Sequence, residues 1–219
     1  MVQTNRGGGA IVTSQAWPPI DHRPGLTLPA LLFWAAVLST LPVLWLNVLP
    51  ALGGSAQKTH ADHSLWIVLH ALTGFLTLVS GFLALWMGWT RAAFDYHRHT
   101  GCTYAGAGMT MAFVALFLAI SDPHRNPASG WATGTLAVAW LVATSMGWRQ
   151  GSRKLWRSHQ MWMIRSMVLT WTFVFCRLAQ RMGDMEGSAP ALAIWAFWLG
   201  PLLIAEIGLQ LWNRRSPAR

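Results

Sequence analysis

Histidine offers the most chemistry in this sequence. The chain has 219 residues, of which eight are histidines and only 11% are charged. A neutral imidazole is a good ligand for haem iron, zinc or copper, so histidines in an apolar chain are candidate cofactor or metal ligands. Three of these histidines begin stripes at helical spacing, in which the next residues recur every three or four positions on one helix face.

Two of the stripes combine a histidine with glycines. They are His70, Gly74, Thr77 and Gly81, and His97, Gly101, Tyr104 and Gly108. Such a face presents a ligand nitrogen beside a surface that lacks side chains, which suits a planar cofactor such as haem. Close packing between membrane helices requires the same small residues, so packing is the alternative interpretation of the glycines.

The third stripe is largely polar. It consists of His159, Met163, Ser166, Thr170, Phe173 and Arg177. A polar face on an apolar helix is expected to point to the bundle interior or to a cavity. Because the two helices involved run in the same direction, His159 and either His97 or His99 enter the membrane at one depth. We therefore predict that they bind haem b as a pair of axial ligands.

Cations close to these histidines extend the prediction. Arg98 lies between the first two candidate ligands, and further cations precede the third, namely Arg153, Lys154 and Arg157. Such cations pair well with the propionates of a haem. The same basic pocket suits a quinone or the anionic headgroup of a lipid. A third interpretation places the histidines in the headgroup zone, bonded to the loops.

A second set of potential ligands is predicted on the opposite side of the membrane. It comprises His60, Asp62, His63 and His124. Two or three histidines with a carboxylate suit zinc or copper, so this set is a candidate metal site. Its spacing matches no recognised metal motif. A second haem between His70 and His124 is disfavoured, because His124 stands in a loop flanked by prolines.

Three charged residues fall within apolar segments. Arg165 and Glu206 each lie about six residues from the cytoplasmic end of a helix, which places both about 9 Å deep. A charge in lipid is costly without a partner, so we expect these two residues to form an ion pair. Arg177 lies near the outer end of its helix and is expected to snorkel or to meet an acidic residue of the outer loops.

The elements that must position these residues are membrane helices. The sequence is 53% apolar, which leaves too few polar residues to cover a soluble globule of this size. A soluble enzyme, a disordered chain and a disulfide scaffold are thereby excluded. Long apolar runs predict an all-α, polytopic membrane protein with a bundle of six transmembrane helices. The expected spans are Leu28 to Leu52, Leu65 to Trp89, Tyr104 to Ile120, Trp131 to Trp148, Met161 to Leu178 and Ala189 to Trp212.

Basic residues predict the orientation of this bundle. Eleven lysines and arginines fall in the two tails and in the loops after the second and fourth spans, against three in the other loops. By the positive-inside rule both termini are cytoplasmic, in a bacterial inner membrane. Basic residues in the cytoplasmic tails and loops then account for the net charge of +9, so no nucleic-acid partner is needed to explain it. The predicted domains are a disordered tail (residues 1–25), the transmembrane domain (26–213) and a basic tail (214–219), without an internal repeat.

Two motifs carry a family resemblance. They are His97-Arg98-xx-Gly101-xx-Tyr104 and His159-xx-Trp162-Met163-x-Arg165-Ser166. They resemble the signatures of a family of bacterial multi-span integral membrane proteins known only as a domain of unknown function, over residues 64–180. The chain is more distantly similar to six-helix b-type cytochromes of the two-haem, ascorbate type. That resemblance implies a haem shared by the third and fifth spans, with His70 at the second-span ligand position and no histidine on the fourth span.

Three functions follow from these patterns. The first is a haem-binding electron-transfer protein, an oxidoreductase if it is an enzyme, with Arg98, Tyr104 and Arg165 around the cofactor. The second is a non-catalytic accessory or assembly subunit of a larger respiratory or photosynthetic membrane complex. The third is a small transporter or metal-handling protein that uses the polar stripe and the outer histidines. The sequence contains no hydrolase, phosphate-binding or paired-cysteine motif.

Overall fold

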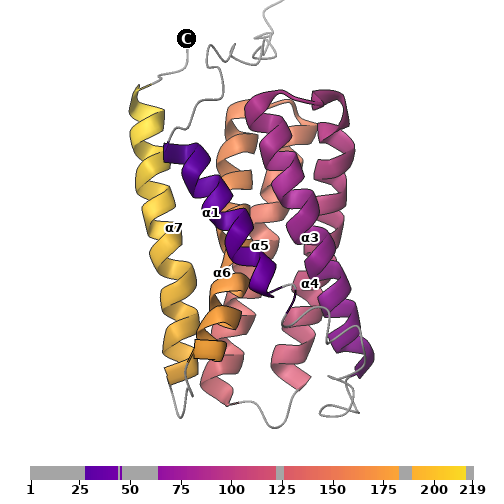
Figure 1. The fold of residues 1–219 in the computed structure, drawn as a ribbon, viewed down its shortest axis with the longest axis vertical. Helices are drawn as coiled ribbons and strands as arrows, with labels where there is room; N and C mark the ends of the chain where they lie inside the picture. The colour runs from indigo at the N-terminus through magenta and orange to yellow at the C-terminus, as the bar shows by residue number, and fades with distance from the viewer. Residues whose placement is uncertain (1–27, 44, 46–63, 122–125, 183–188, 216–219) are drawn as a thin grey trace, which may run out of the picture.

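The computed structural model describes residues 28–43, 45, 64–121, 126–182 and 189–215, which form helices and turns. Its long helices are α1 (Leu28–Val43), α3 (Ser64–Thr90), α4 (His97–Ser121), α5 (Pro127–Ser152), α6 (Trp156–Met182) and α7 (Ala189–Arg215). A short 3-10 helix, η3 (Phe94–Tyr96), leads into α4. Helices α3 to α7 run side by side along the long axis of the molecule, and α1 crosses them obliquely (Figure 1).

The all-α prediction is confirmed for the described residues, and each predicted span overlaps one helix. The main difference is α4, which begins at His97 rather than at Tyr104. Its first turns are polar and give no hydropathy signal, although they continue the helix beyond the apolar segment. The predicted N-terminal tail and residues 46–52 of the first predicted span lie outside the described residues.

Three segments of the described chain are long and apolar enough to cross a membrane, namely Leu65–Thr90, Phe94–Ser121 and Ala191–Trp212. Helices α5 and α6 have a similar length and a more polar composition. Part of that polarity faces inward, because Thr144 of α5 and Ser166 and Thr170 of α6 are all buried. Buried polar residues in apolar helices are the pattern expected when a bundle interior has a polar task.

Neighbouring helices along the chain pack against each other. Helix α3 packs along α4, α4 along α5, and α5 along α6, while α7 lies against α5 and α6. Helix α1 rests on α6. Side chains of α4 and α6 meet across the interior, where the rings of His97 and His159 are neighbours. The four helices α3 to α6 therefore enclose one common interior.

The hydrophobic core lies where α4 to α7 meet. It contains Met111, Ala112, Leu136, Trp140, Ala143, Leu169 and Trp198. Two of these core side chains occupy the space beside glycines of the predicted stripes. A Cβ at Gly74 would lie 3.3 Å from the Met111 side chain, and one at Gly108 would lie 3.3 Å from the Trp140 ring. These contacts support the packing interpretation of both glycines.

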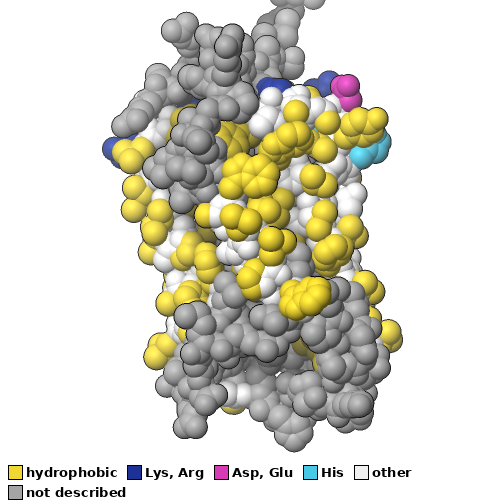
Figure 2. Space-filling view, in the orientation of Figure 1, with side chains coloured by type: hydrophobic (Ala, Val, Ile, Leu, Met, Phe, Trp, Pro, Cys, Tyr) yellow, Lys and Arg dark blue, Asp and Glu magenta, His cyan; other side chains and the backbone are white. Residues whose placement is uncertain are grey.

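The surface of the bundle is apolar on its flank and charged at one end (Figure 2). Exposed large apolar side chains occur on α3, α4, α5 and α7, for example Leu72, Phe113, Val138 and Leu203. Soluble proteins rarely expose such continuous apolar surface, whereas lipid contact requires it. Lysine and arginine side chains gather at the end of the molecule that also holds the α3–α4 and α5–α6 turns (Figures 1 and 2).

Candidate functional site

The candidate site lies where two helical hairpins turn at the same end of the bundle (Figure 1). The first hairpin is α3–α4 and the second is α5–α6. Both turns use residues other than glycine in the left-handed region. Arg91 and Ala93 have φ of 61° and 52° in the first turn, and Lys154 has φ of 59° in the second. These turns return the chain so that α4 and α6 both begin close to a histidine.

His97 is held against the helix that precedes it. Its Nδ1 lies 3.0 Å from the carbonyl oxygen of Ala84 on α3. A Cβ at Gly88 would lie 3.2 Å from Cε1 of the imidazole, so this glycine leaves room for the ring. On its other side, the ring stacks on Phe94 with centroids 5.1 Å apart. The imidazole is thus fixed in orientation from both sides.

His159 is held in the same manner in the second hairpin. Its Nδ1 lies 2.8 Å from the carbonyl oxygen of Gly147 on α5. A Cβ at Gly151 would lie only 2.8 Å from Nδ1, which makes glycine a steric requirement at this position. A histidine, a carbonyl of the preceding helix and a glycine one turn further along that helix therefore recur in both hairpins. The contacts repeat although the sequence was predicted to contain no repeat.

The two imidazoles face a common space. Their centroids are 6.4 Å apart and their planes are nearly perpendicular, at 88°. A carbonyl oxygen only accepts hydrogen bonds, so each Nδ1 donates its proton to Ala84 or Gly147. In the neutral ring the lone pair then remains on Nε2, which is the nitrogen available to a metal. Both neutral imidazoles therefore carry their lone pair on Nε2.

A cluster of buried hydroxyl groups lies on the same helix faces, two turns deeper. Tyr104 Oη lies 2.7 Å from Ser166 Oγ and 2.9 Å from Thr170 Oγ1. Ser166 Oγ lies 2.7 Å from Thr144 Oγ1, which also bonds the Trp140 carbonyl. This hydroxyl cluster joins α4, α5 and α6 below the histidines. A hydroxyl both donates and accepts, so the cluster satisfies its own groups without water.

A glycine makes room for the tyrosine of this cluster. A Cβ at Gly81 would lie 2.8 Å from the Tyr104 ring and 3.1 Å from Met167 Sδ. The predicted stripes of α4 and α6 therefore do face each other, with histidine against histidine and Tyr104 against Ser166. Tyr104 was predicted to bind a cofactor, whereas its hydroxyl is engaged within the bundle.

Other predicted site residues have separate locations. His99 is exposed, so His97 is the member of this pair that faces the interior. Arg98 is exposed beside it at the charged end. His70 lies on α3 in edge contact with the Phe173 ring, at 6.4 Å. It is separated from Ala84 by about 20 Å of helix, and so it belongs to the other end of the bundle.

The predicted outer metal site falls in a part of the chain that the structure does not describe. His60, Asp62, His63 and His124 all lie outside the described residues. Within the described part of the chain, there is no group of three or more His, Cys, Asp or Glu residues arranged for a metal ion. A haem needs only two ligands from the protein, because the porphyrin supplies the others.

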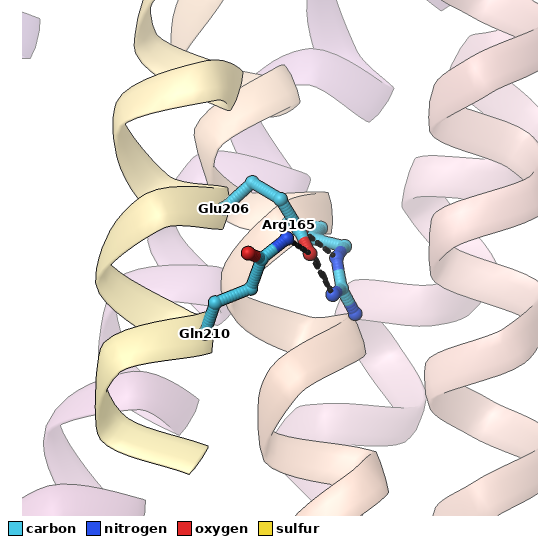
Figure 3. Close-up of polar contacts among 3 residues, drawn as sticks. All are labelled: Arg165, Glu206 and Gln210. Carbon is cyan, nitrogen blue, oxygen red and sulfur yellow. Dashed lines mark hydrogen bonds and ion pairs between the residues drawn. The ribbon is translucent and has the colours of Figure 1, made fainter. Parts of the chain in front are cut away.

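The predicted ion pair is confirmed. Arg165 donates to Glu206 on α7 through Nε at 2.8 Å and through Nη2 at 3.0 Å (Figure 3). Equal depth on consecutive helices was the signal that found it. Arg165 was also predicted to lie beside a cofactor, but its guanidinium is directed to α7 and packs over the Trp162 ring at 4.8 Å.

Sequence reasoning missed several residues of the site. Ala84, Gly88, Gly147 and Gly151 orient the histidines, and Thr144 completes the hydroxyl cluster. The available signal was a glycine eight or nine residues before each histidine, across a short turn. The first turn also supplies a cation, because Arg91 lies 4.5 Å from the Phe94 centroid. Burial lowers the pKa of the Arg91 guanidinium, which nevertheless stays charged at physiological pH.

Comparison with known proteins identifies the family. Residues 67–209 match the family model described as "Predicted membrane protein (DUF2306)". The chain therefore belongs to this family of predicted membrane proteins of unknown function, as its two motifs suggested. No curated protein and no solved structure matches the chain. The more distant likeness to b-type cytochromes stays a prediction.

Proposed function

We propose that this protein binds one b-type haem between His97 and His159 and passes electrons within the membrane. The observation that carries this proposal is the pair of imidazoles, each held through Nδ1 by a backbone carbonyl and separated by 6.4 Å. Two hairpins that repeat one arrangement bring one imidazole each to the same place, as two protein ligands of one haem would require.

The separation of the rings fits this role. The two ring centroids are 6.4 Å apart, so one group of metal and ligands would be within reach of both imidazoles.

Each residue has a defined task in this proposal. His97 and His159 would hold the iron through Nε2, and the Ala84 and Gly147 carbonyls, which fix the rings, would raise their basicity as ligands. Arg91 and Arg98 lie at the same end of the bundle, where cations pair with propionates. The haem supplies the chemistry, which is the gain and loss of one electron.

The proposal includes the topology that the sequence predicted. Six spans place both termini and the α3–α4 and α5–α6 turns in the cytoplasm of a bacterium, with the haem near the cytoplasmic face. The cations at one end of the molecule support this orientation through the positive-inside rule (Figure 2). The described members of this group are Arg91, Arg98, Arg149, Arg153, Lys154, Arg157 and Arg214.

An absorbance spectrum of the detergent-purified protein tests the proposal, with haem supplied during expression. A Soret peak, sharp bands after reduction by dithionite and about one iron per chain are expected. A colourless, iron-free protein overturns it and favours the accessory-subunit interpretation. Bound zinc or copper without haem also overturns it, and would direct attention to the outer histidines.

A further inference from the structure

The Arg165–Glu206 ion pair lies on the flank of the bundle, between α6 and α7 (Figure 3). The two side chains keep 20% and 35% of their surface exposed. The Glu206 carboxylate also accepts a hydrogen bond from Gln210 Nε2 at 3.4 Å, and the Trp162 ring covers one face of the Arg165 guanidinium. These four residues of two helices form a partly exposed polar patch. We call it the α6–α7 patch.

The surroundings of the α6–α7 patch are apolar. Leu203 and Ile207, which lie on the Glu206 side of α7, are 62% and 61% exposed. Charged groups that face hydrocarbon are costly, so a polar patch in such a surface favours an occupant that bonds to it. Glu206 lies almost two turns before Trp212, which places the patch about 9 Å inside the membrane.

The charge balance of the patch selects a neutral occupant. Arg165 and Glu206 neutralise each other, so an anionic phosphate gains little from binding there. The depth also lies below the zone that phospholipid headgroups occupy. Only Nε and Nη2 of the guanidinium bond the carboxylate, which leaves further N–H donors for a ligand. A flat molecule with carbonyl or hydroxyl oxygens and an apolar tail matches these groups.

We propose that the α6–α7 patch binds the ring of a lipid-soluble quinone, or of its quinol, from within the membrane. Arg165 donates to a ring carbonyl, Glu206 accepts from a quinol hydroxyl, and the Gln210 amide does either. Leu203 and Ile207, which are exposed beside these groups, face the apolar tail. The chemistry common to ubiquinone-type and menaquinone-type rings is sufficient for this recognition.

The position of the patch connects it with the histidine pair. Trp162 lies one turn after His159 on α6. A quinone ring at Arg165 therefore lies on the same helix as His159, one of the two proposed haem ligands. This connection rests on the proposed function. Binding of the quinone itself does not, because none of its contacts involves a histidine.

The experiment measures quinone binding by the full-length protein in phosphatidylcholine nanodiscs. Decylubiquinone is titrated in, and tryptophan fluorescence quenching is followed. The wild type is expected to saturate at about one quinone per chain. Gln210→Leu leaves the ion pair intact and is expected to weaken binding about threefold to tenfold, the effect of one hydrogen bond. The double variant Arg165→Gln/Glu206→Gln strands no charge and is expected to abolish saturable binding.

A matched control lies on another flank of the bundle. Thr135 is an exposed polar residue of α5 whose hydroxyl bonds the Trp131 carbonyl, and Thr135→Val is expected to bind decylubiquinone like the wild type. Quenching that never saturates and is equal in all variants overturns the proposal. Efficient cross-linking of two Gln210→Cys chains also overturns it, because a second copy of the chain would then cover the patch.

Absorbance spectra of the same samples separate this inference from the proposed function. A colourless protein that binds decylubiquinone, and binds it more weakly in Gln210→Leu, retains the quinone site while the haem proposal fails. A coloured protein with unsaturable quenching retains the haem and overturns the quinone site. The expected result is a coloured protein whose spectrum is unchanged by Gln210→Leu, while its affinity for decylubiquinone falls.

Discussion

The two hairpins hold their histidines in the same way but fill the next layer of the bundle differently. In α3–α4, Gly81 leaves a notch that the Tyr104 ring occupies. In α5–α6, the corresponding layer contains Thr144 and Ser166, whose small hydroxyls bond each other. The large Tyr104 side chain of the first hairpin thus bonds the small Ser166 and Thr170 side chains of the second. The two hairpins have equivalent contacts only around His97 and His159. A ligand bound by both histidines would require equivalence only there.

The second hairpin differs again in its outward contacts. Its α6 carries Arg165, which forms an ion pair with Glu206 of α7. The second hairpin is therefore fixed to a neighbouring helix by charge, and the first by packing and by the hydroxyl cluster. Substitutions that act on one hairpin only can test each part of this comparison.

The largest stability loss is expected from Arg165→Leu in the second hairpin. It strands the Glu206 carboxylate among apolar helices, which we expect to cost about 3 kcal/mol. The double variant Arg165→Leu/Glu206→Leu removes both charges and should recover most of this loss. Unfolding of the detergent-solubilised protein by added SDS measures both values. Equal losses in the single and double variants would show that the ion pair does not anchor α6.

A smaller loss is expected from Gly81→Ala in the first hairpin. The new Cβ would lie 2.8 Å from the Tyr104 ring, so the ring must shift and the bonds to Ser166 and Thr170 weaken. Overpacking of this kind costs about 2 kcal/mol. Gly106→Ala is the control, because nothing lies within 4 Å of a Cβ there. The same SDS titration should give a lower unfolding midpoint for Gly81→Ala than for Gly106→Ala. Indistinguishable midpoints would contradict the claim that the Tyr104 ring needs the space beside Gly81.

The smallest effect concerns the glycines beside the histidines. A Cβ at Gly151 would lie 2.8 Å from His159 Nδ1, and one at Gly88 would lie 3.2 Å from His97 Cε1. Gly151→Ala therefore disturbs the bond to the Gly147 carbonyl more than Gly88→Ala disturbs its counterpart. We expect haem occupancy, measured as Soret absorbance per chain, to fall in Gly151→Ala by the equivalent of about 1 kcal/mol. A greater fall in Gly88→Ala would reverse the comparison.

The sequence was sufficient for the helices and for one pair of residues. Apolar runs located every long helix, and equal depth on consecutive helices paired Arg165 with Glu206. The predicted start of α4 was wrong because the first turns of this helix are polar. Hydropathy detects only the apolar part of a helix. Helical spacing also predicted which faces of α4 and α6 lie together, because phase along a regular helix is fixed by geometry.

The details of the candidate site depend on contacts between helices, which the sequence alone does not specify. The choice between His97 and His99 depends on which residue meets a carbonyl of α3, and spacing within one helix does not contain that information. The repeat of the hairpins was invisible for a related reason. What repeats is a backbone carbonyl and the absence of a side chain at Gly88 and Gly151, whereas the side chains of the next layer differ.

The most direct measurement compares reduced absorbance spectra of His97→Ala, His159→Ala and His99→Ala, each purified with the elution profile of the folded wild type. The account predicts that His97→Ala and His159→Ala, one from each hairpin, both lose the sharp reduced bands, and that His99→Ala keeps them. Loss of the bands in His99→Ala, or their survival in either of the other two variants, would contradict a haem shared between the hairpins.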